Sequence, residues 1–265
     1  FIVFALTLSL NYFIMLYLGS LAFFLFLIPS CGFVVEVINQ ILMKKVDTQT
    51  LFRIKLENHL PKEYSTMIVI PTIVQNPEKV NNMFDNLELF YLSNRAKNLY
   101  FCLLGDVTSA KTAKTKMDEK IVKAGLEKVR KLNSKYGKEI FYFAYRNRCF
   151  NAKEDSYLGY ERKRGALLHF NQLLLGKLNE KSKNKFFRVH TFGDFKEKIK
   201  YVIPLDADTK LLLNTALKLI GTMVHPMHQP ILSDDGLRVV KGYGIMQPRV
   251  SIDVEVTNKS EYSQL

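Results

Sequence analysis

Hydrophobic residues dominate the first part of the chain. Residues 1–35 carry no charged side chain, and Glu36 is the first charge. The apolar run over 12–35 is longer than the roughly 20 residues that a helix needs to cross a bilayer. We therefore predict a transmembrane segment over 1–35, with residues 1–8 as the end of an earlier span. A cleaved signal peptide is the alternative, but no basic stretch precedes the run and the run is too long.

Beyond a segment at 36–64, interpreted as a linker or an interfacial helix, short apolar runs alternate with amphipathic stretches. Runs rich in β-branched and aromatic residues indicate strands, and apolar residues spaced three or four apart indicate helices. The expected strands are 65–71, 99–104, 140–145 and 200–205, and the expected helices are 78–94, 118–136, 164–178 and 213–224. This alternation predicts βαβ units and an α/β fold with a parallel sheet over 65–265.

Two segments depart from the alternation. The lysine-rich stretch 179–199 has few apolar positions, and we interpret it as a basic surface insertion. The segment 242–249 contains two glycines ahead of apolar residues, which predicts a turn followed by a strand.

Charge and cysteine content narrow the class of protein. The chain has 38 basic and 25 acidic side chains, a net charge of +13, all of it beyond residue 35. Its three cysteines are far apart in sequence, so a zinc ribbon, a redox dithiol or a disulfide framework is not expected. The basic charge leaves open a membrane-anchored module that binds nucleic acid or anionic lipid. The cations lie in helices and in the insertion, without a series of stacking aromatic residues, which disfavours nucleic acid.

The strongest chemical signal follows the last predicted strand. Asp206 and Asp208 stand two residues apart at the end of a buried run. Carboxylates are the ligands that Mg²⁺ prefers, usually with phosphate oxygens from a substrate. A solvated turn is the alternative, since Asp is common in turns. In a parallel sheet the carboxyl ends of the strands share one edge, so residues 71–72, 106 and 146–148 are expected at this edge too.

A second signal opens the helix predicted at 164–178. Arg162, Lys163 and Arg164 precede Gly165 at its amino end, where free amides and the helix dipole attract anions. The helix dipole does not stabilise cations at the amino end of a helix, so a bound diphosphate would explain why they lie there. A solvated basic patch is the alternative interpretation. Asp106, at the end of the second strand, is either a hydrogen-bond acceptor for a base or ribose or a turn acid. The pair His225 and His228 is interpreted as structural, because Pro226 argues against a metal-binding helix.

The two strongest motifs, Gly159-Tyr-Glu-Arg-Lys-Arg-Gly165 and Leu205-Asp-Ala-Asp-Thr209, occur together in this order. With them, the chain resembles the glycosyltransferase region of cyclic β-1,2-glucan synthases, membrane proteins related to processive inverting transferases such as cellulose synthase. The matching segments are 67–72, 87–94, 103–106, 146–151, 159–165, 205–209, 225–226 and 242–249.

The resemblance implies a GT-A-like nucleotide-binding domain that takes UDP-glucose as donor and a glucan as acceptor. It implies Mg²⁺ or Mn²⁺ on Asp206 and Asp208. It also implies a multi-pass protein of the inner membrane with a cytoplasmic soluble domain. The basic residues that follow the apolar run independently predict that the chain after residue 40 is cytoplasmic. The implied donor-binding residues are Pro71, Thr72, Asp106, Arg162, Lys163 and Arg164.

The chain also departs from the family pattern. The family has a later Asp as general base and a later Gln-x-x-Arg-Trp stretch, and this chain contains no Trp. We therefore expect a fragment of a longer protein, with its base beyond Leu265, that binds donor without turnover. A transferase for another nucleotide sugar or linkage on the same fold is the remaining alternative.

Overall fold

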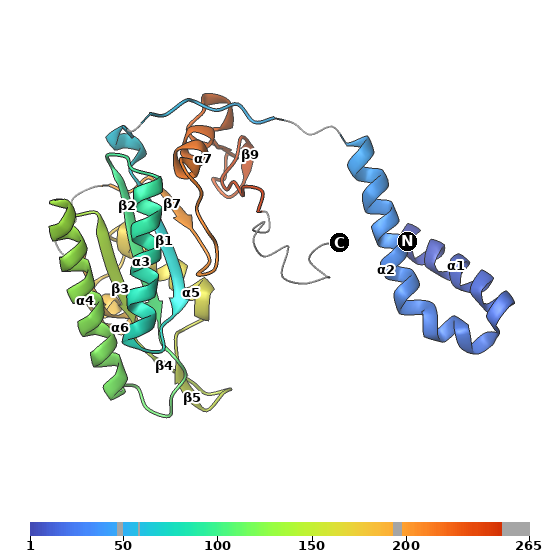
Figure 1. The fold of residues 1–265 in the computed structure, drawn as a ribbon, viewed down its shortest axis with the longest axis horizontal. Coiled ribbons are helices and arrows are strands. Elements are labelled where there is room, and N and C mark those ends of the chain that lie inside the picture. The colour runs from blue at the N-terminus through green and yellow to red at the C-terminus, as the bar shows by residue number, and fades with distance from the viewer. Residues whose placement is uncertain (47–49, 58, 193–197, 251–265) are drawn as a thin grey trace. The chain divides into compact units, whose positions relative to one another are not determined.

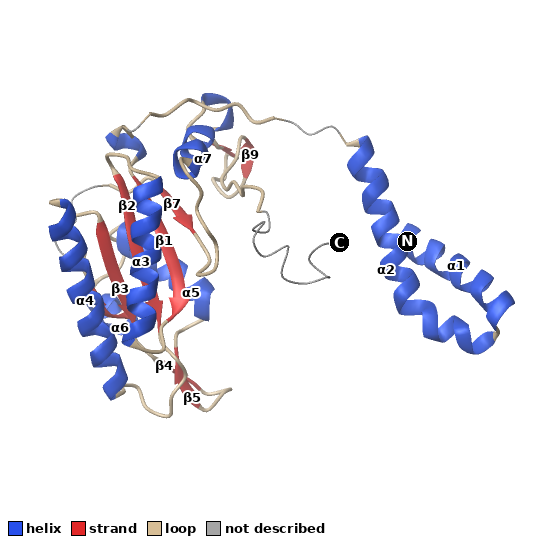
Figure 2. Cartoon of the chain, viewed as in Figure 1, coloured by secondary structure: helices blue, strands red, loops and turns tan. Residues whose placement is uncertain are grey.

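The computed structural model describes residues 1–46, 50–57, 59–192 and 198–250. The chain divides into two compact units, Phe1–Leu51 and Phe52–Leu265. The first unit is helical and the second contains the sheet (Figures 1 and 2).

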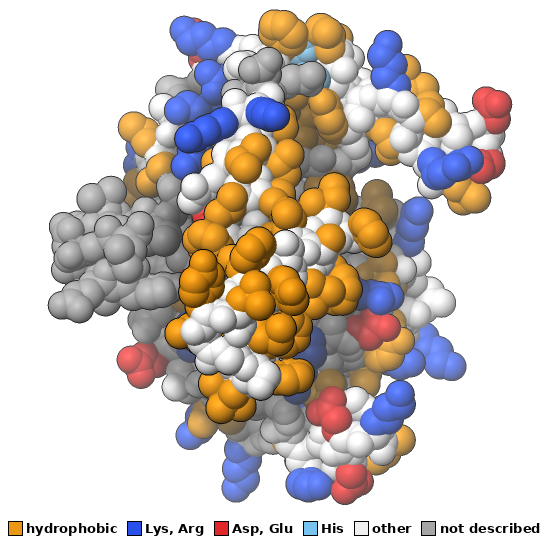
Figure 3. Space-filling view, turned by 90° about the vertical axis from the view of Figure 1, so that its right-hand side faces the viewer, with side chains coloured by type: hydrophobic (Ala, Val, Ile, Leu, Met, Phe, Trp, Pro, Cys, Tyr) orange, Lys and Arg blue, Asp and Glu red, His pale blue; other side chains and the backbone are white. Residues whose placement is uncertain are grey.

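Two helices that pack against each other form the first unit, α1 (Ile2–Leu18) and α2 (Ser20–Lys45). Gly19 separates them with a φ of 86°, a backbone conformation that glycine adopts without steric cost. Among the described residues, α2 is the one helix long and apolar enough to cross a membrane. Hydrophobic side chains cover much of the surface of this unit that Figure 3 shows.

The predicted span over 12–35 therefore has the wrong bounds. The polar residues near its start do not end a helix, because Asn11 donates from Nδ2 to the Thr7 carbonyl at 2.9 Å inside α1. The helix ends instead at Gly19, and α2 continues to Lys45, into the first third of the segment interpreted as a linker.

A five-stranded sheet organises the second unit, in the order β6-β3-β2-β1-β7. The strands are β1 (Thr66–Ile73), β2 (Leu99–Asp106), β3 (Phe141–Arg146), β6 (Phe187–His190) and β7 (Tyr201–Pro204). The strands β1, β2, β3 and β7 are parallel, and β6 runs antiparallel to β3. This confirms the predicted α/β class with a mostly parallel sheet.

Helices cover both faces of the sheet, as Figure 1 shows. Successive residues of a strand point to opposite faces, so Ile68 and Ile70 belong to one buried cluster while Met67 and Val69 belong to another. The first cluster lies under α3 (Pro77–Ser93), α4 (Lys116–Tyr136) and α7 (Thr215–Met223), and the second lies under α5 (Arg162–Leu174).

Local signals explain where the long helices begin and end. Asn76 caps α3 by accepting from the Lys79 amide at 2.8 Å, and Pro77 occupies the first turn. Thr115 and Asp118 form a reciprocal capping box at the start of α4. Gly137 ends α4 in the left-handed conformation.

Three predictions near the carboxyl half need correction. The supposed insertion 179–199 contains α6 (Glu180–Phe186) and the edge strand β6, whose Phe187 is buried in the core; residues 193–197 lie outside the described part. The segment 242–249 follows a strand instead of containing one, because β9 (Val239–Lys241) pairs with β8 (Ile231–Leu232) before Gly242. The helix expected at 164–178 begins and ends earlier, as α5.

Asn94 connects the end of α3 to the start of α7. Its buried side chain donates to the Leu212 carbonyl at 3.2 Å and accepts from the Ala216 amide at 3.0 Å. We predict that Asn94→Ala lowers the free energy of unfolding by about 1–3 kcal/mol, because buried backbone groups lose their partners. Chemical denaturation measures this, with Asn82→Ala on an exposed position of α3 as the control. Equal stabilities of the two variants would contradict the stabilising role of Asn94.

Candidate functional site

The carboxyl ends of the parallel strands bring the predicted site residues to one edge of the sheet. The chain proceeds from β1 to β2 to β3 in one direction, while β7 is added on the other side of β1. Such a change of direction is where open α/β sheets bind ligands, outside the carboxyl ends. Thr72 lies near the end of β1, Asp106 ends β2, and Asp206 follows β7.

Asp206 and Asp208 lie in an exposed turn just after β7, closed by a hydrogen bond from the Thr209 amide to the Asp206 carbonyl at 3.0 Å. Lys163 Nζ forms an ion pair with Asp206 Oδ1. The structure thus brings the carboxylate pair and the cationic helix start together. Both side chains of this ion pair are more than half exposed, so a ligand can reach them.

The three consecutive cations point to different partners. Arg162 donates to the Val107 carbonyl at 3.4 Å and to Ser109 Oγ at 3.1 Å, in the loop after β2. Arg164 pairs with Glu161 at 3.3 Å across one turn and is exposed. Of the three, Lys163 is the one with an ion pair to Asp206.

Asp106 and the β1 residues take buried positions. The Asp106 carboxylate is 3.1 Å from the Arg146 guanidinium, accepts from the Val107 amide at 2.9 Å, and is only 5% exposed. Pro71 is buried opposite Leu104, and Thr72 is half-buried opposite Gly105. The structure therefore places Asp106 inside the protein, paired with a cation.

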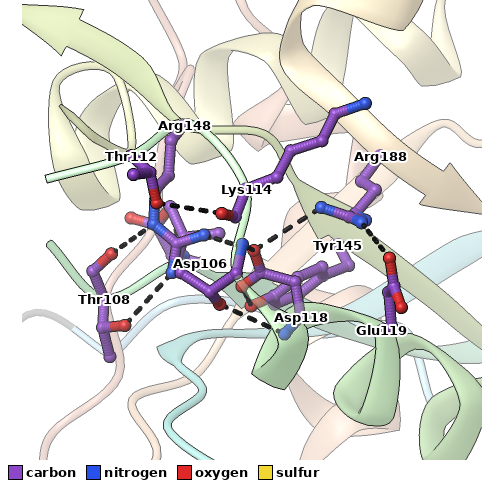
Figure 4. A network of polar contacts seen from close by, with 11 residues as sticks. Asp106, Thr108, Thr112, Lys114, Asp118, Glu119, Tyr145, Arg148 and Arg188 are labelled. Atoms are coloured by element: carbon purple, nitrogen blue, oxygen red, sulfur yellow. Dashed lines mark hydrogen bonds and ion pairs between the residues drawn. The ribbon is translucent and has the colours of Figure 1, made fainter. Parts of the chain in front are cut away.

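A second polar network lies behind this edge, and sequence reasoning missed it (Figure 4). Arg148, which follows β3, donates to Asp118 Oδ2 at 2.5 Å and to the Thr108 carbonyl at 2.8 Å. Tyr145 donates to Asp118 Oδ1 at 3.2 Å, and Arg188 approaches the same carboxylate at 3.5 Å. The capping-box spacing of Thr115 and Asp118 was the available signal, but it predicts a helix start and not an ion pair.

Burial sets the pKa values in these networks. Burial alone would raise the pKa of Asp118, but the hydrogen bonds from Arg148 and from Thr115 outweigh it and hold the pKa below its ordinary value. Burial and the neighbouring Asp118 carboxylate raise the pKa of Tyr145. Burial lowers the pKa of the Arg146 guanidinium, and the Asp106 carboxylate opposes that shift. The Asp118 carboxylate therefore remains ionised near neutral pH and holds Arg148 in place.

The histidine pair makes local contacts. His225 accepts from the Met227 amide at 3.3 Å, and Nδ1 of the buried His228 lies 2.7 Å from the Thr222 carbonyl. These contacts agree with the structural interpretation. Among the described residues, no group of three or more His, Cys, Asp or Glu side chains is arranged to hold a metal ion.

Comparison with known proteins tests the family resemblance that the motifs indicate. No protein-family model matches the chain. Cyclic β-(1,2)-glucan synthase NdvB of Rhizobium meliloti (strain 1021) is 29% identical over 230 residues, which are 86% of this chain. The chain spans about 8% of the length of that protein. The match confirms the resemblance found in the motifs, to a region of that synthase.

The buried Asp118 makes stability depend on pH. A carboxylate whose pKa is lowered by folding adds stability above its unfolded pKa of about 3.9, and loses it as pH falls through the folded value. We predict that Asp118→Asn costs about 3–5 kcal/mol near neutral pH, because Arg148 loses a buried partner. The difference from the wild type should shrink below about pH 4.

Urea denaturation between pH 3 and pH 7 measures this dependence. Asp155→Asn, at an exposed ion pair with Lys111, is the matched control and should change stability by about 1 kcal/mol or less. A loss of unfolding free energy in Asp118→Asn that stays the same from pH 3 to pH 7 would contradict this role of the Asp118 carboxylate.

Proposed function

We propose that this chain is the donor-binding part of a membrane-bound inverting glycosyltransferase that transfers glucose from UDP-glucose to a growing β-1,2-glucan. The observation that carries the proposal is the contact between Lys163 at the start of α5 and Asp206 after β7. It places acidic and basic groups at the edge where an α/β sheet binds nucleotides.

The carboxylates fit a hard divalent cation. Asp206 and Asp208 offer exposed oxygen atoms, and Asp206 already attracts the ammonium group of Lys163. The described residues supply no third acidic or nitrogen ligand at this place. Mg²⁺ commonly binds one or two carboxylates and completes its shell with water and substrate phosphates, so the donor set suits Mg²⁺ or Mn²⁺ on a diphosphate. When bound, the ion would neutralise negative charge on that diphosphate.

The start of α5 would supply the opposite side of the clamp. Its free amides and dipole favour an anion, and Lys163 and Arg164 add two positive charges. As UDP departs, negative charge grows on the diphosphate, so these groups stabilise the transition state more than the ground state. The acceptor hydroxyl attacks the anomeric carbon from the face opposite the diphosphate, which inverts its configuration.

The similarity to NdvB supports the choice of sugar chemistry. That protein is named as a cyclic β-(1,2)-glucan synthase. A glucan synthase needs an activated glucose donor and a glucan acceptor, and UDP-glucose on a GT-A-like domain is the donor that we infer. A transferase for another nucleotide sugar is separated from this by comparing UDP-glucose with other UDP-sugars as competitors.

The membrane proposal is supported by α2. Its side chains are mostly exposed and apolar, and it ends with Lys44 and Lys45. Positive residues at the end of a span favour the cytoplasmic side, where nucleotide sugars are available.

The metal assignment predicts a binding defect. In the full-length protein, Asp208→Ala should weaken Mg²⁺-dependent UDP binding by about tenfold or more, because it removes one of the two carboxylate ligands of the ion. Such a change corresponds to about 1.4 kcal/mol. Calorimetry with and without Mg²⁺ measures this, with the exposed Asp234→Ala as control. Unchanged metal-dependent affinity in Asp208→Ala would refute the assignment.

The orientation also has a direct test. Alkaline phosphatase, whose disulfides form only outside the cytoplasm, should stay inactive when fused after Val46 at the end of α2. A fluorescent protein fused at the same residue should be bright and membrane-associated. Active phosphatase at this position would place the second unit on the other side of the membrane.

A further inference from the structure

Arg146 is a buried charge that joins three elements at the site edge. It is the last residue of β3 and is 1% exposed. Its Nη1 lies 3.1 Å from Asp106 Oδ1, at the end of β2. Nη1 and Nη2 also donate to the carbonyls of Arg162 and Tyr160, at 3.1 and 2.6 Å. One guanidinium thus connects β2, β3 and the start of α5.

The two carbonyls that Arg146 binds enclose an unusual stretch of backbone. Glu161 and Arg162 have φ values of 50° and 48°, in the left-handed region that non-glycine residues seldom adopt. Two successive residues in this conformation persist only where the surroundings hold them. The guanidinium provides that hold, since its planar fork reaches the carbonyls on both sides.

The glycines of the motif fit the same arrangement. A Cβ atom on Gly159 would lie 2.0 Å from Asp106 Oδ1, and one on Gly165 would lie 2.1 Å from the Tyr160 carbonyl oxygen. Both ends of the Gly159–Gly165 segment therefore press against the groups that Arg146 binds. The cations between them are left at the surface, with Lys163 beside Asp206.

We infer that Arg146 is a positioning residue for the donor site, which acts by holding the first turn of α5 so that Lys163 faces Asp206. This rests on the proposed function only for the identity of the ligand. Arg146 is buried and contacts Asp106 and backbone carbonyls, so it affects a bound diphosphate through α5 and not by touching it. Lysine cannot replace it fully, because a single ammonium lacks the fork that spans two carbonyls.

The test compares Arg146→Met and Arg146→Lys with a matched variant, Arg148→Met. Arg148 is similarly buried at the same sheet edge but pairs with Asp118 and Thr108. Hydrogen exchange at the amides of Arg162 and Gly165, which donate to the carbonyls of Gly159 and Glu161, reports the position of α5 in the ligand-free full-length protein. Calorimetry with Mg²⁺ and UDP reports the site, and thermal unfolding reports overall stability.

Arg146→Met should speed exchange at these amides and weaken UDP binding by about tenfold or more, the size seen when partners that orient binding groups are removed. Arg146→Lys should recover part of both. Arg148→Met should lower the thermal stability without a selective change in hydrogen exchange at the start of α5 or in UDP affinity. If Arg146→Met does not fold, Arg146→Lys is compared with Arg148→Met in the same way.

Equal exchange at the Arg162 and Gly165 amides in the Arg146 and Arg148 variants would overturn the inference, as would wild-type UDP affinity in Arg146→Met. A wild-type protein that binds no UDP, while Arg146→Met still frees the α5 amides, would instead remove the proposed function and leave the positioning of α5 standing.

Discussion

The buried ion pair between Asp106 and Arg146 is the interaction on which the site depends. It joins the ends of two neighbouring parallel strands, and the same guanidinium holds the backbone that opens α5. A buried charge is costly unless paired and hydrogen-bonded, so the partners of Arg146 are also what make its burial tolerable. The exposed contact between Lys163 and Asp206 is a consequence of this buried arrangement, since it requires α5 to start at a fixed place.

The same edge combines rigid and accessible parts. Asp106 and Arg146 are buried and hold the start of α5, whereas Asp206, Asp208 and Lys163 are exposed and free to exchange partners with a ligand. A site for a metal and a diphosphate needs both properties. The side chains that bind the metal and the diphosphate must be accessible, and their positions must already be fixed before these bind.

Much of the fold could be predicted from the sequence, for a physical reason. Strands buried on both faces, such as β1 and β2, are continuous apolar runs and are easy to recognise. The carboxyl ends of parallel strands share one edge of the sheet, so the carboxylate pair could be predicted to lie near the cationic segment. The edge strand β6 is short and lies among lysines, so its pattern is weak. The networks of Arg146 and Asp118 depend on tertiary neighbours that no local pattern encodes, and Asp106 was predicted as a ligand contact because its pairing could not be foreseen.

The central claim is that the Asp206–Asp208 turn and the start of α5 hold a metal–diphosphate between them. An experimental structure of the full-length protein with Mg²⁺ and UDP tests it most directly. The account predicts density for the ion at the two carboxylates, with the diphosphate oxygens against Lys163 and the first amides of α5. A diphosphate bound away from both elements would contradict it.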